Sequence, residues 1–215
     1  MHPSRLLQTC GIQPWFLQEA ETKVEIKEPA TSTTSAWQQL QEKVCQCQQC
    51  PLHQTRTQTV FGSGNQQADL LIIGEAPGAN EDQQGLPFVG RAGSLLTDML
   101  QAIGFARDEV YIANILKCRP PNNRDPQAEE VSECLSYLQQ QIALLQPKLI
   151  LAVGRIGAQN LLQRKEALSR LRGNTYHYHD IPVMVTYHPA YLLRSPQQKK
   201  QAYKDLLRVK SFLVN

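Results

Sequence analysis

The chain has 215 residues and a formal net charge of +3, and 41% of its residues are hydrophobic. This length suits one folded domain with a short appendage, and the apolar runs are shorter than the ~20 residues that span a membrane. A charge of this size does not by itself indicate nucleic-acid binding, because that inference needs a more basic protein.

The N-terminal part of the chain differs in composition from the rest. Residues 1–27 hold an apolar group too small for an independent core, and residues 28–35 mix one proline with small polar side chains. We therefore expect a docking segment over 1–27, a linker over 28–35 and a folded domain over 36–215. The N-terminus has neither the basic region nor the apolar stretch of a secretory signal, so a cytoplasmic protein is expected.

The domain alternates between apolar runs and amphipathic stretches, after a first helix expected over residues 37–44. The strand-like runs cover residues 69–73, 110–115, 149–153 and 183–187, and the helix-like stretches cover 93–103, 127–145, 156–162 and 197–212. Nearly continuous apolar runs are typical of strands covered on both faces. The alternation predicts a three-layer α/β/α sandwich around a central four-stranded, mainly parallel sheet.

Polar or glycine-containing segments follow each predicted strand. Gly74-Glu75-Ala76-Pro77-Gly78 comes after the first strand, and Asn114 with Lys117–Pro121 comes at the end of the second. Gly154-Arg155 follows the third strand, and His188-Pro189-Ala190 follows the fourth. Because ligands bind at the carboxyl ends of the strands in such sheets, we expect these segments to meet at one edge.

Six cysteines in a reducing cytoplasm indicate metal ligands or buried thiols rather than disulfides. Cys47 and Cys50 are separated by two residues, and Cys118 and Cys134 lie far downstream. This spacing can place two thiolates on one metal centre and leaves both zinc and an iron–sulfur cluster open. Cys45 is an additional thiol that lies too close to Cys47 for the usual motif.

Taken together, several segments resemble the motifs of the family 4 uracil-DNA glycosylases over roughly residues 44–212. They are Val60–Gly62, Gly74–Gly78, Gly85–Gly93, Tyr111–Pro121, Asn123–Pro126, Leu171–Gly173 and His188–Leu193. The resemblance implies an enzyme that extrudes uracil from single- or double-stranded DNA and hydrolyses its N-glycosidic bond. It also implies a [4Fe–4S] cluster held by Cys47, Cys50, Cys118 and Cys134.

Four positions are expected to bind the extruded base. Phe88 resembles the residue that stacks on the base. The Asn114 amide can pair with N3–H and O4 of uracil, which the cytosine edge does not match. Glu81 resembles the position that excludes the thymine methyl group, and Pro77 belongs to the same pocket. Each has a structural alternative, respectively a core phenylalanine, an asparagine bonded to loop backbone, a surface acid and an ordinary turn.

Catalysis requires hydrogen-bond donors near O2 of the departing base, where negative charge collects. We assign this task to His188 and to backbone N–H groups near Glu75 and Ala76. The Glu75 carboxylate is expected either to orient water or to stabilise the cationic sugar. Its motif lacks the aspartate that classical uracil glycosylases offer to water.

DNA contacts are predicted from the loop after His188 and from basic side chains. Leu192 and Leu193 suit an exposed apolar wedge that fills the space left by the base, although packing at a helix start is the alternative. The basic residues expected near the DNA backbone are Arg91, Lys117, Arg119 and Arg194.

Residues 5–17 resemble the leading segment of the psi subunit of the replicative polymerase, which implies a partner in the replication machinery. The alternative is that Trp15 and Phe16 pack on the catalytic domain. A monomer is expected, because neither an exposed heptad nor a long unpaired hydrophobic strand is evident. Two other functions stay open, a glycosylase that also accepts deaminated purines and a non-catalytic, replication-associated iron–sulfur protein that binds DNA.

Overall fold

The computed structural model describes residues 31–214. The chain divides into two units, residues 1–31 and 32–215, and the second unit carries the fold described below. The docking segment predicted over residues 1–27 lies outside the described residues.

A six-stranded sheet with the order β1-β3-β2-β4-β6-β5 forms the centre of the described fold. Its four inner strands are parallel, namely β3 (Tyr111–Asn114), β2 (Leu70–Gly74), β4 (Leu149–Val153) and β6 (Ile181–Thr186). These are the four strands predicted from the sequence, so the predicted fold class is confirmed. Two short antiparallel strands that were not predicted, β1 (Ser63–Gly64) and β5 (Thr175–Tyr178), extend the sheet at its edges.

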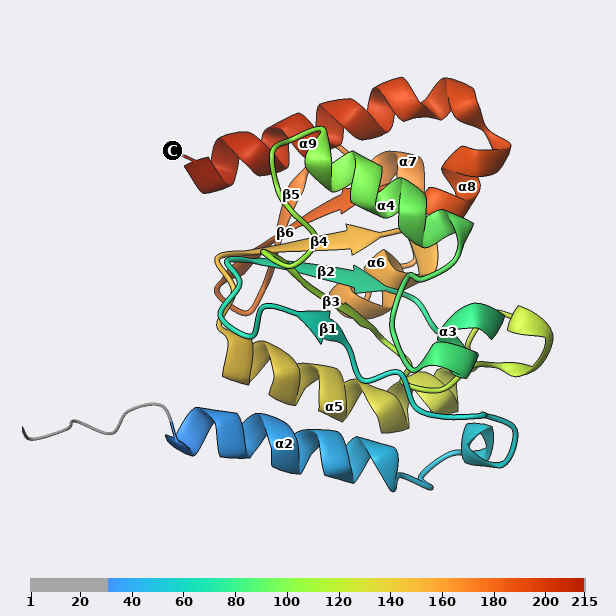
Figure 1. The fold of residues 1–215 in the computed structure, drawn as a ribbon. Coiled ribbons are helices and arrows are strands. Elements are labelled where there is room, and N and C mark those ends of the chain that lie inside the picture. The colour runs from blue at the N-terminus through green and yellow to red at the C-terminus, as the bar shows by residue number, and fades with distance from the viewer. Residues whose placement is uncertain (1–30, 215) are drawn as a thin grey trace, which may run out of the picture. The chain divides into compact units, whose positions relative to one another are not determined.

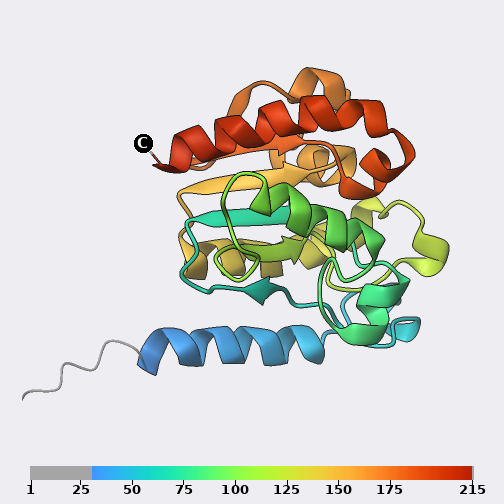
Figure 2. The ribbon, with the colours of Figure 1, turned by 45° about the horizontal axis from the view of Figure 1, so that its top comes forward.

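Helices cover both faces of the sheet (Figures 1 and 2). One face carries α2 (Thr31–Cys45), α5 (Ala128–Leu145), α6 (Arg155–Leu162) and α7 (Leu168–Leu171). The other face carries α4 (Arg91–Gln101), α8 (Pro189–Arg194) and α9 (Lys199–Val214). The remaining elements are α3 (Ala79–Gln84) and the 3-10 helices η1 (Pro51–Gln54), η2 (Pro121–Asn123) and η3 (Pro196–Gln198). Among residues 31–214, no helix combines the length and the apolar character that crossing a membrane requires.

Burial on both faces explains the apolar strands. Along β2, Leu71 and Ile73 pack into the core beneath α2 and α5, whereas Leu70 and Ile72 pack beneath α4 and α9. Successive side chains of a strand point to opposite faces, so a strand between two helical layers needs apolar residues at every position.

The linker predicted over residues 28–35 is wrong for residues 31–35, because α2 begins at Thr31. Trp37, Leu40 and Val44 follow helical spacing and are almost fully buried against the core. This packing stabilises the helix, and serine and threonine are only weakly unfavourable within one, so the helix extends through them. Residues 28–30 lie outside the described residues.

Candidate active site

A cavity of about 440 Å³ opens at the carboxyl ends of the parallel strands. Loops that follow β2, β3 and β6 supply its walls. It brings together all seven residues predicted to bind the substrate, namely Glu75, Ala76, Pro77, Glu81, Phe88, Asn114 and His188. The convergence expected from the sheet topology is therefore present.

Two glycines allow these side chains to approach the strand ends. A Cβ atom on Gly74 would lie 2.3 Å from Oδ1 of Asn114 and 2.8 Å from Cζ of Phe88. Gly154 has a φ of +94°, and a Cβ atom there would lie 3.0 Å from Cβ of His188. A side chain at either position would displace a residue of the cavity wall, which explains the glycines after β2 and β4.

His188 is the N-cap residue of α8. Its Nδ1 accepts a hydrogen bond of 3.1 Å from the Ala190 N–H, so a neutral ring carries its proton on Nε2. Burial, followed by the charge of Arg194, lowers the pKa of His188 to about 4. At neutral pH the ring is therefore an uncharged Nε2–H donor in the wall of the cavity.

Glu75 is a half-buried carboxyl group directly after β2. Burial, reinforced by the carboxylate of Asp125 and opposed by Arg155, raises the pKa of Glu75 to about 7. Asp125 and Arg155 form an ion pair of 3.3 Å, and Asp125 also lines the cavity. Near neutral pH, Glu75 can therefore change its protonation state in response to its neighbours.

Glu81 joins two walls of the cavity. One carboxylate oxygen accepts from the Gly78 N–H at 3.1 Å, and the other accepts from the N–H groups of Val89 at 3.0 Å and Gly90 at 3.4 Å. The alternative of a surface acid is therefore wrong, because Glu81 ties the loop after β2 to the segment before α4. Exclusion of a methyl group by Glu81 stays a prediction.

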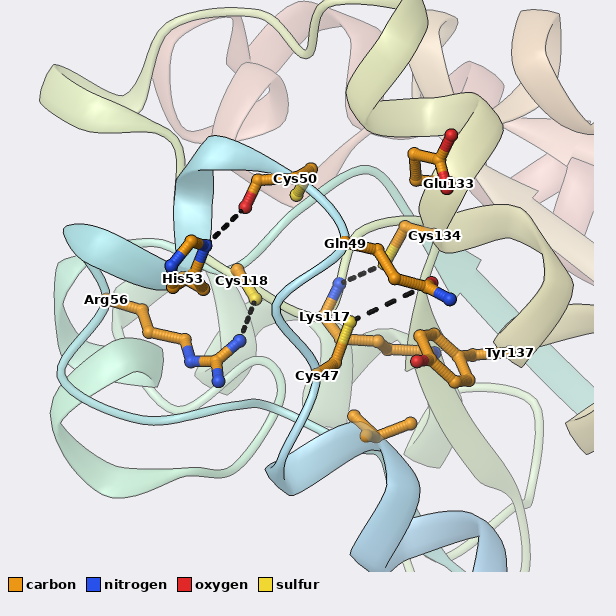
Figure 3. A pocket seen from close by; sticks show the side chains of 11 residues that line it. Cys47, Gln49, Cys50, His53, Arg56, Lys117, Cys118, Glu133, Cys134 and Tyr137 are labelled. Carbon is orange, nitrogen blue, oxygen red and sulfur yellow. Dashed lines mark hydrogen bonds between the residues drawn. The ribbon is translucent and has the colours of Figure 1, made fainter.

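A second pocket holds the four cysteines that the resemblance singled out (Figure 3). Cys47 and Cys50 come from the segment between α2 and η1, Cys118 follows β3, and Cys134 lies on α5. Cys118 and Cys134 are buried, and Cys47 and Cys50 are partly buried. Cys45 is exposed and does not line this pocket.

Two of these sulfurs accept hydrogen bonds. The Arg56 guanidinium donates to Sγ of Cys118 at 3.1 Å, and the Lys117 N–H donates to Sγ of Cys134 at 3.2 Å. Within residues 31–214, no three His, Cys, Asp or Glu side chains are grouped closely enough to hold a metal ion. The pocket thus contains four thiols and two groups that donate hydrogen bonds to sulfur, although the thiols are not arranged as metal ligands.

Comparison with known proteins decides the family. A model of the uracil DNA glycosylase superfamily matches residues 61–208. The type-4 uracil-DNA glycosylase of Pyrobaculum aerophilum is 45% identical over 177 residues, which cover 79% of this chain and 90% of that protein. The chain belongs to the type-4 uracil-DNA glycosylases.

Two further members of the family are similarly close. The type-4 uracil-DNA glycosylase of Archaeoglobus fulgidus is 43% identical, with 78% of this chain and 88% of the relative covered. That of Thermotoga maritima is 42% identical, with 80% and 92% covered. The family resemblance seen in the motifs therefore extends over most of the chain.

In this type-4 glycosylase the structure corrects the prediction for Lys117, whose side chain does not face DNA. Lys117 is 1% exposed, and its Nζ donates to the Asn114 carbonyl at 2.8 Å and to Oε1 of Gln141 at 2.6 Å. Burial lowers the pKa of Lys117 to about 8. The stem of a lysine can cross a core when its ammonium group finds buried acceptors, and here it supports the loop that carries Asn114.

The wedge prediction is wrong for Leu192. Residues 189–194 form α8 instead of an open loop, and Leu192 lies one turn after His188 on the side that packs into the core. Leu192 is 1% exposed, whereas Leu193 is 37% exposed. Packing at a helix start, the alternative, is correct for Leu192, and the wedge role of Leu193 stays a prediction.

Of the arginines predicted to contact DNA, one lines the cavity and two are sequence neighbours of residues that line it. Arg194 lines the cavity itself, and the exposed Arg91 precedes Ala92, which also lines it. Arg119 precedes the lining residue Pro120, and its Nε donates to Oδ1 of Asn123 at 2.8 Å. Their contacts with DNA stay a prediction.

Two functional neighbours were missed by the sequence analysis. Asp125 is one position of the Asn123–Pro126 motif, and none of the motifs includes Gln141. A signal existed for Gln141, because it is a polar residue on the face of α5 that is otherwise buried against the core. No pattern in the sequence places Asp125 beside Glu75, since 49 residues and a folded loop separate them.

Proposed function

We propose that this chain removes uracil from DNA by extruding the nucleotide into the cavity and hydrolysing the N-glycosidic bond, which leaves an abasic site. As a type-4 uracil-DNA glycosylase, the protein is a hydrolase of DNA base-excision repair. One observation carries the assignment of the site: the base-binding, stacking and proton-donating side chains predicted from separate motifs line a single cavity.

Recognition of uracil is assigned to Asn114 and Phe88. Asn114 is 2% exposed and is the last residue of β3, and its amide is assigned to pairing with the uracil edge. The Phe88 ring supplies a flat apolar face, and its centroid lies 5.5 Å from that of His188. Stacking of a base on an aromatic ring is worth ~1–3 kcal/mol, which offsets part of the cost of extrusion.

His188 is assigned to the departing base. Its Nε2–H is a neutral donor, and a preorganised donor in a cavity shielded from water stabilises developing negative charge by ~3–4 kcal/mol. A neutral ring serves here because its Nε2–H donates a hydrogen bond at neutral pH without first taking up a proton. Backbone N–H groups near Glu75 and Ala76 are assigned to the same oxygen.

Glu75 is assigned to the sugar side of the scissile bond. Its carboxylate either orients the attacking water or stabilises the cationic sugar, and both roles require the ionised form. The raised pKa makes this ionised form a stronger base than an exposed glutamate.

The test is release of uracil from single-stranded DNA and from duplex DNA that contains a U·G pair. We expect activity in the unaltered protein and a loss of ~100-fold or more in His188→Ala. His177→Ala is the matched control, because His177 is exposed on β5 away from the cavity. Equal rates in both variants would remove His188 from catalysis. No release by the unaltered protein would favour the non-catalytic alternative.

We also propose that Cys47, Cys50, Cys118 and Cys134 hold a [4Fe–4S] cluster. Support comes from their shared pocket and from the sulfur-directed donors Arg56 and Lys117, a common environment for cluster thiolates. The cluster would act as a structural clamp between α2, the segment after β3 and α5, since hydrolysis of a glycosidic bond requires no electron transfer.

Iron and sulfide analysis, with a visible absorption spectrum of the purified chain, tests the cluster. Cys134→Ser should lose the band and the iron, whereas Cys45→Ser should keep both because Cys45 is outside the pocket. Stoichiometric zinc without iron would contradict the proposal.

The remaining expectations concern the surroundings of the enzyme. We propose a monomer that works in the cytoplasm at the nucleoid, with a replication-machinery partner bound through residues 5–17. The motif over residues 5–17 supports the partner, and the DNA substrate supports the location. These residues lie outside the described part of the chain.

A further inference from the structure

The backbone of Phe88 is held in an unfavourable conformation. Its φ is +53°, in the left-handed region that a bulky residue without special support seldom adopts. The ring nevertheless is buried at the cavity wall, against the position where Gly74 leaves room for it. The turn that carries the proposed stacking residue is therefore strained and must be stabilised from outside.

Arg107 provides that support from behind the cavity wall. One terminal nitrogen of its guanidinium donates to the carbonyls of Pro87 at 2.7 Å and of Phe88 at 3.0 Å. The other donates to the Thr97 hydroxyl at 3.3 Å, and this hydroxyl donates to the Gly93 carbonyl at 3.2 Å. The guanidinium thus connects the turn to the first turns of α4.

The close packing of the turn leaves it few alternatives. A Cβ atom on Gly93 would lie 1.7 Å from the Phe88 carbonyl oxygen, so the helix backbone and the turn are in direct contact. On the other side, the Val89 N–H is held by Glu81. Arg107 completes this arrangement by binding the carbonyls that bracket the strained residue.

Arg107 has no carboxylate partner among residues 31–214, because no ion pair there includes it. Burial lowers the pKa of its guanidinium. A half-buried cation without an anion is costly, and its hydrogen bonds go to the turn that holds Phe88 and to α4. Arg107 does not itself line the cavity.

We propose that Arg107 is a positioning residue for base stacking, which fixes the Phe88 turn so that the ring is already in place when the base enters. This inference rests on the proposed role of Phe88 in binding uracil. Without the guanidinium, the turn relaxes toward an ordinary backbone conformation and the ring loses its fixed orientation. Base stacking then has to restore that order at the moment of binding.

The expected effect of Arg107→Ala is a loss of roughly 10-fold to 100-fold in kcat/KM for single-stranded uracil DNA, the range that stacking accounts for. Arg107→Lys should not restore activity, because one ammonium group lacks the planar fork that joins these carbonyls to Thr97. Added guanidinium ion at low millimolar concentration should restore part of the activity of Arg107→Ala, and equal ammonium ion should not. Arg164→Ala is the control, since Arg164 is exposed and pairs with Glu166 away from the cavity.

A double-mutant cycle with Phe88→Ala separates positioning from general stability. If Arg107 acts through the ring, Arg107→Ala adds little to the loss already caused by Phe88→Ala. Additive losses, or the absence of rescue by guanidinium in a folded variant, would overturn the proposal. If Arg107→Ala does not fold, Arg107→Lys takes its place, and full activity of Arg107→Lys would also overturn the proposal. Failure of the proposed role of Phe88 would look different, because Phe88→Ala alone would then leave uracil release unchanged. Failure of the proposed function would leave even the unaltered protein without uracil release.

Discussion

Glu75 and His188 must both be deprotonated for the proposed chemistry, Glu75 as a carboxylate and His188 as a neutral imidazole. Glu75 acts when ionised, above a pKa of about 7, and His188 acts when neutral, above a pKa of about 4. We therefore expect kcat/KM to rise with pH to a plateau above pH ~7, with slope one between pH ~4 and ~7 and a steeper fall below. In Glu75→Gln the residual activity should no longer change near pH 7, which is the upper limb of the profile, and should still fall below pH ~4, which is the lower limb. An unchanged upper limb would exclude Glu75 as its source.

The neighbours of Glu75 offer a second prediction at the residue scale. Asp125→Asn removes a negative charge and should move the upper limb to lower pH, whereas Arg155→Met removes a positive charge and should move it to higher pH. The measurement is the pH dependence of uracil release by each variant. Asp180→Asn, at the exposed turn between β5 and β6, is the control. Shifts in the same direction for both variants would contradict the electrostatic account.

Individual residues differ in how far the sequence predicts them. Asn114 is the last residue of β3 and His188 comes two residues after β6, and the edge of a parallel sheet brings such residues together whatever the conformation of the loops. Lys117 and Leu192 were misplaced because each lies in a segment whose local folding is decided by tertiary contacts. A lysine reads as exposed from its type alone, and only the buried acceptors on the β3 end and on α5 place it inside.

At the scale of elements, the end of β6 is fixed by a buried ion pair. Arg172 after α7 and Asp205 on α9 are joined at 2.7 Å, with side chains 11% and 8% exposed. Asp205 also accepts from the Thr186 hydroxyl at 2.8 Å, and the Arg172 guanidinium lies 4.0 Å from the centroid of the Tyr187 ring. The segment after α7, helix α9 and the end of β6 are therefore in contact at Thr186, which lies two residues before His188.

Removal of one partner from this pair should be costly. Arg172→Met leaves the Asp205 carboxylate buried without its cation, and we expect the free energy of unfolding to fall by about 3–5 kcal/mol. Urea unfolding monitored by circular dichroism provides the measurement. Lys148→Met is the matched control, because its pair with Asp69 is exposed and should contribute less than about 1 kcal/mol. Similar losses in both variants would show that burial does not determine the contribution of these pairs.

The secondary structure shows which elements the sequence specifies by itself. The four inner strands and the helices α4, α5, α6 and α9 were predicted within a few residues, because burial gives the strands a continuous apolar run and the helices an apolar face. The short helices α3, α7 and α8 were not predicted. The edge strands were missed since β1 has only two residues and β5 alternates between exposed and half-buried positions. β1 pairs with β3, which lies far away in the sequence, whereas β5 pairs with the neighbouring β6 across the turn at His179 and Asp180.

The arrangement of charge at the cavity mouth concerns the whole molecule. The net charge of +3 is modest, yet Arg91, Arg119 and Arg194 all lie beside cavity-lining positions at the same edge of the sheet. Affinity for DNA falls with salt in proportion to the number of phosphates that the protein neutralises. A small number of well-placed arginines can therefore bind the backbone without a strongly basic chain.

Each of these arginines should contribute a measurable share of the salt dependence. Replacement of Arg91, Arg119 or Arg194 by alanine should reduce the slope of log affinity against log salt by about 1 and weaken binding to all sequences alike. Fluorescence anisotropy with labelled single-stranded DNA at several salt concentrations gives the slope. Arg164→Ala is the control, because Arg164 follows the C-terminal end of α6 and does not line the cavity. If Arg164→Ala changes the slope as much as the three others, the DNA contacts are spread over the surface rather than concentrated at the cavity mouth. An unchanged slope in all three variants would place the DNA on another face, and the cavity would then need a different route for its substrate.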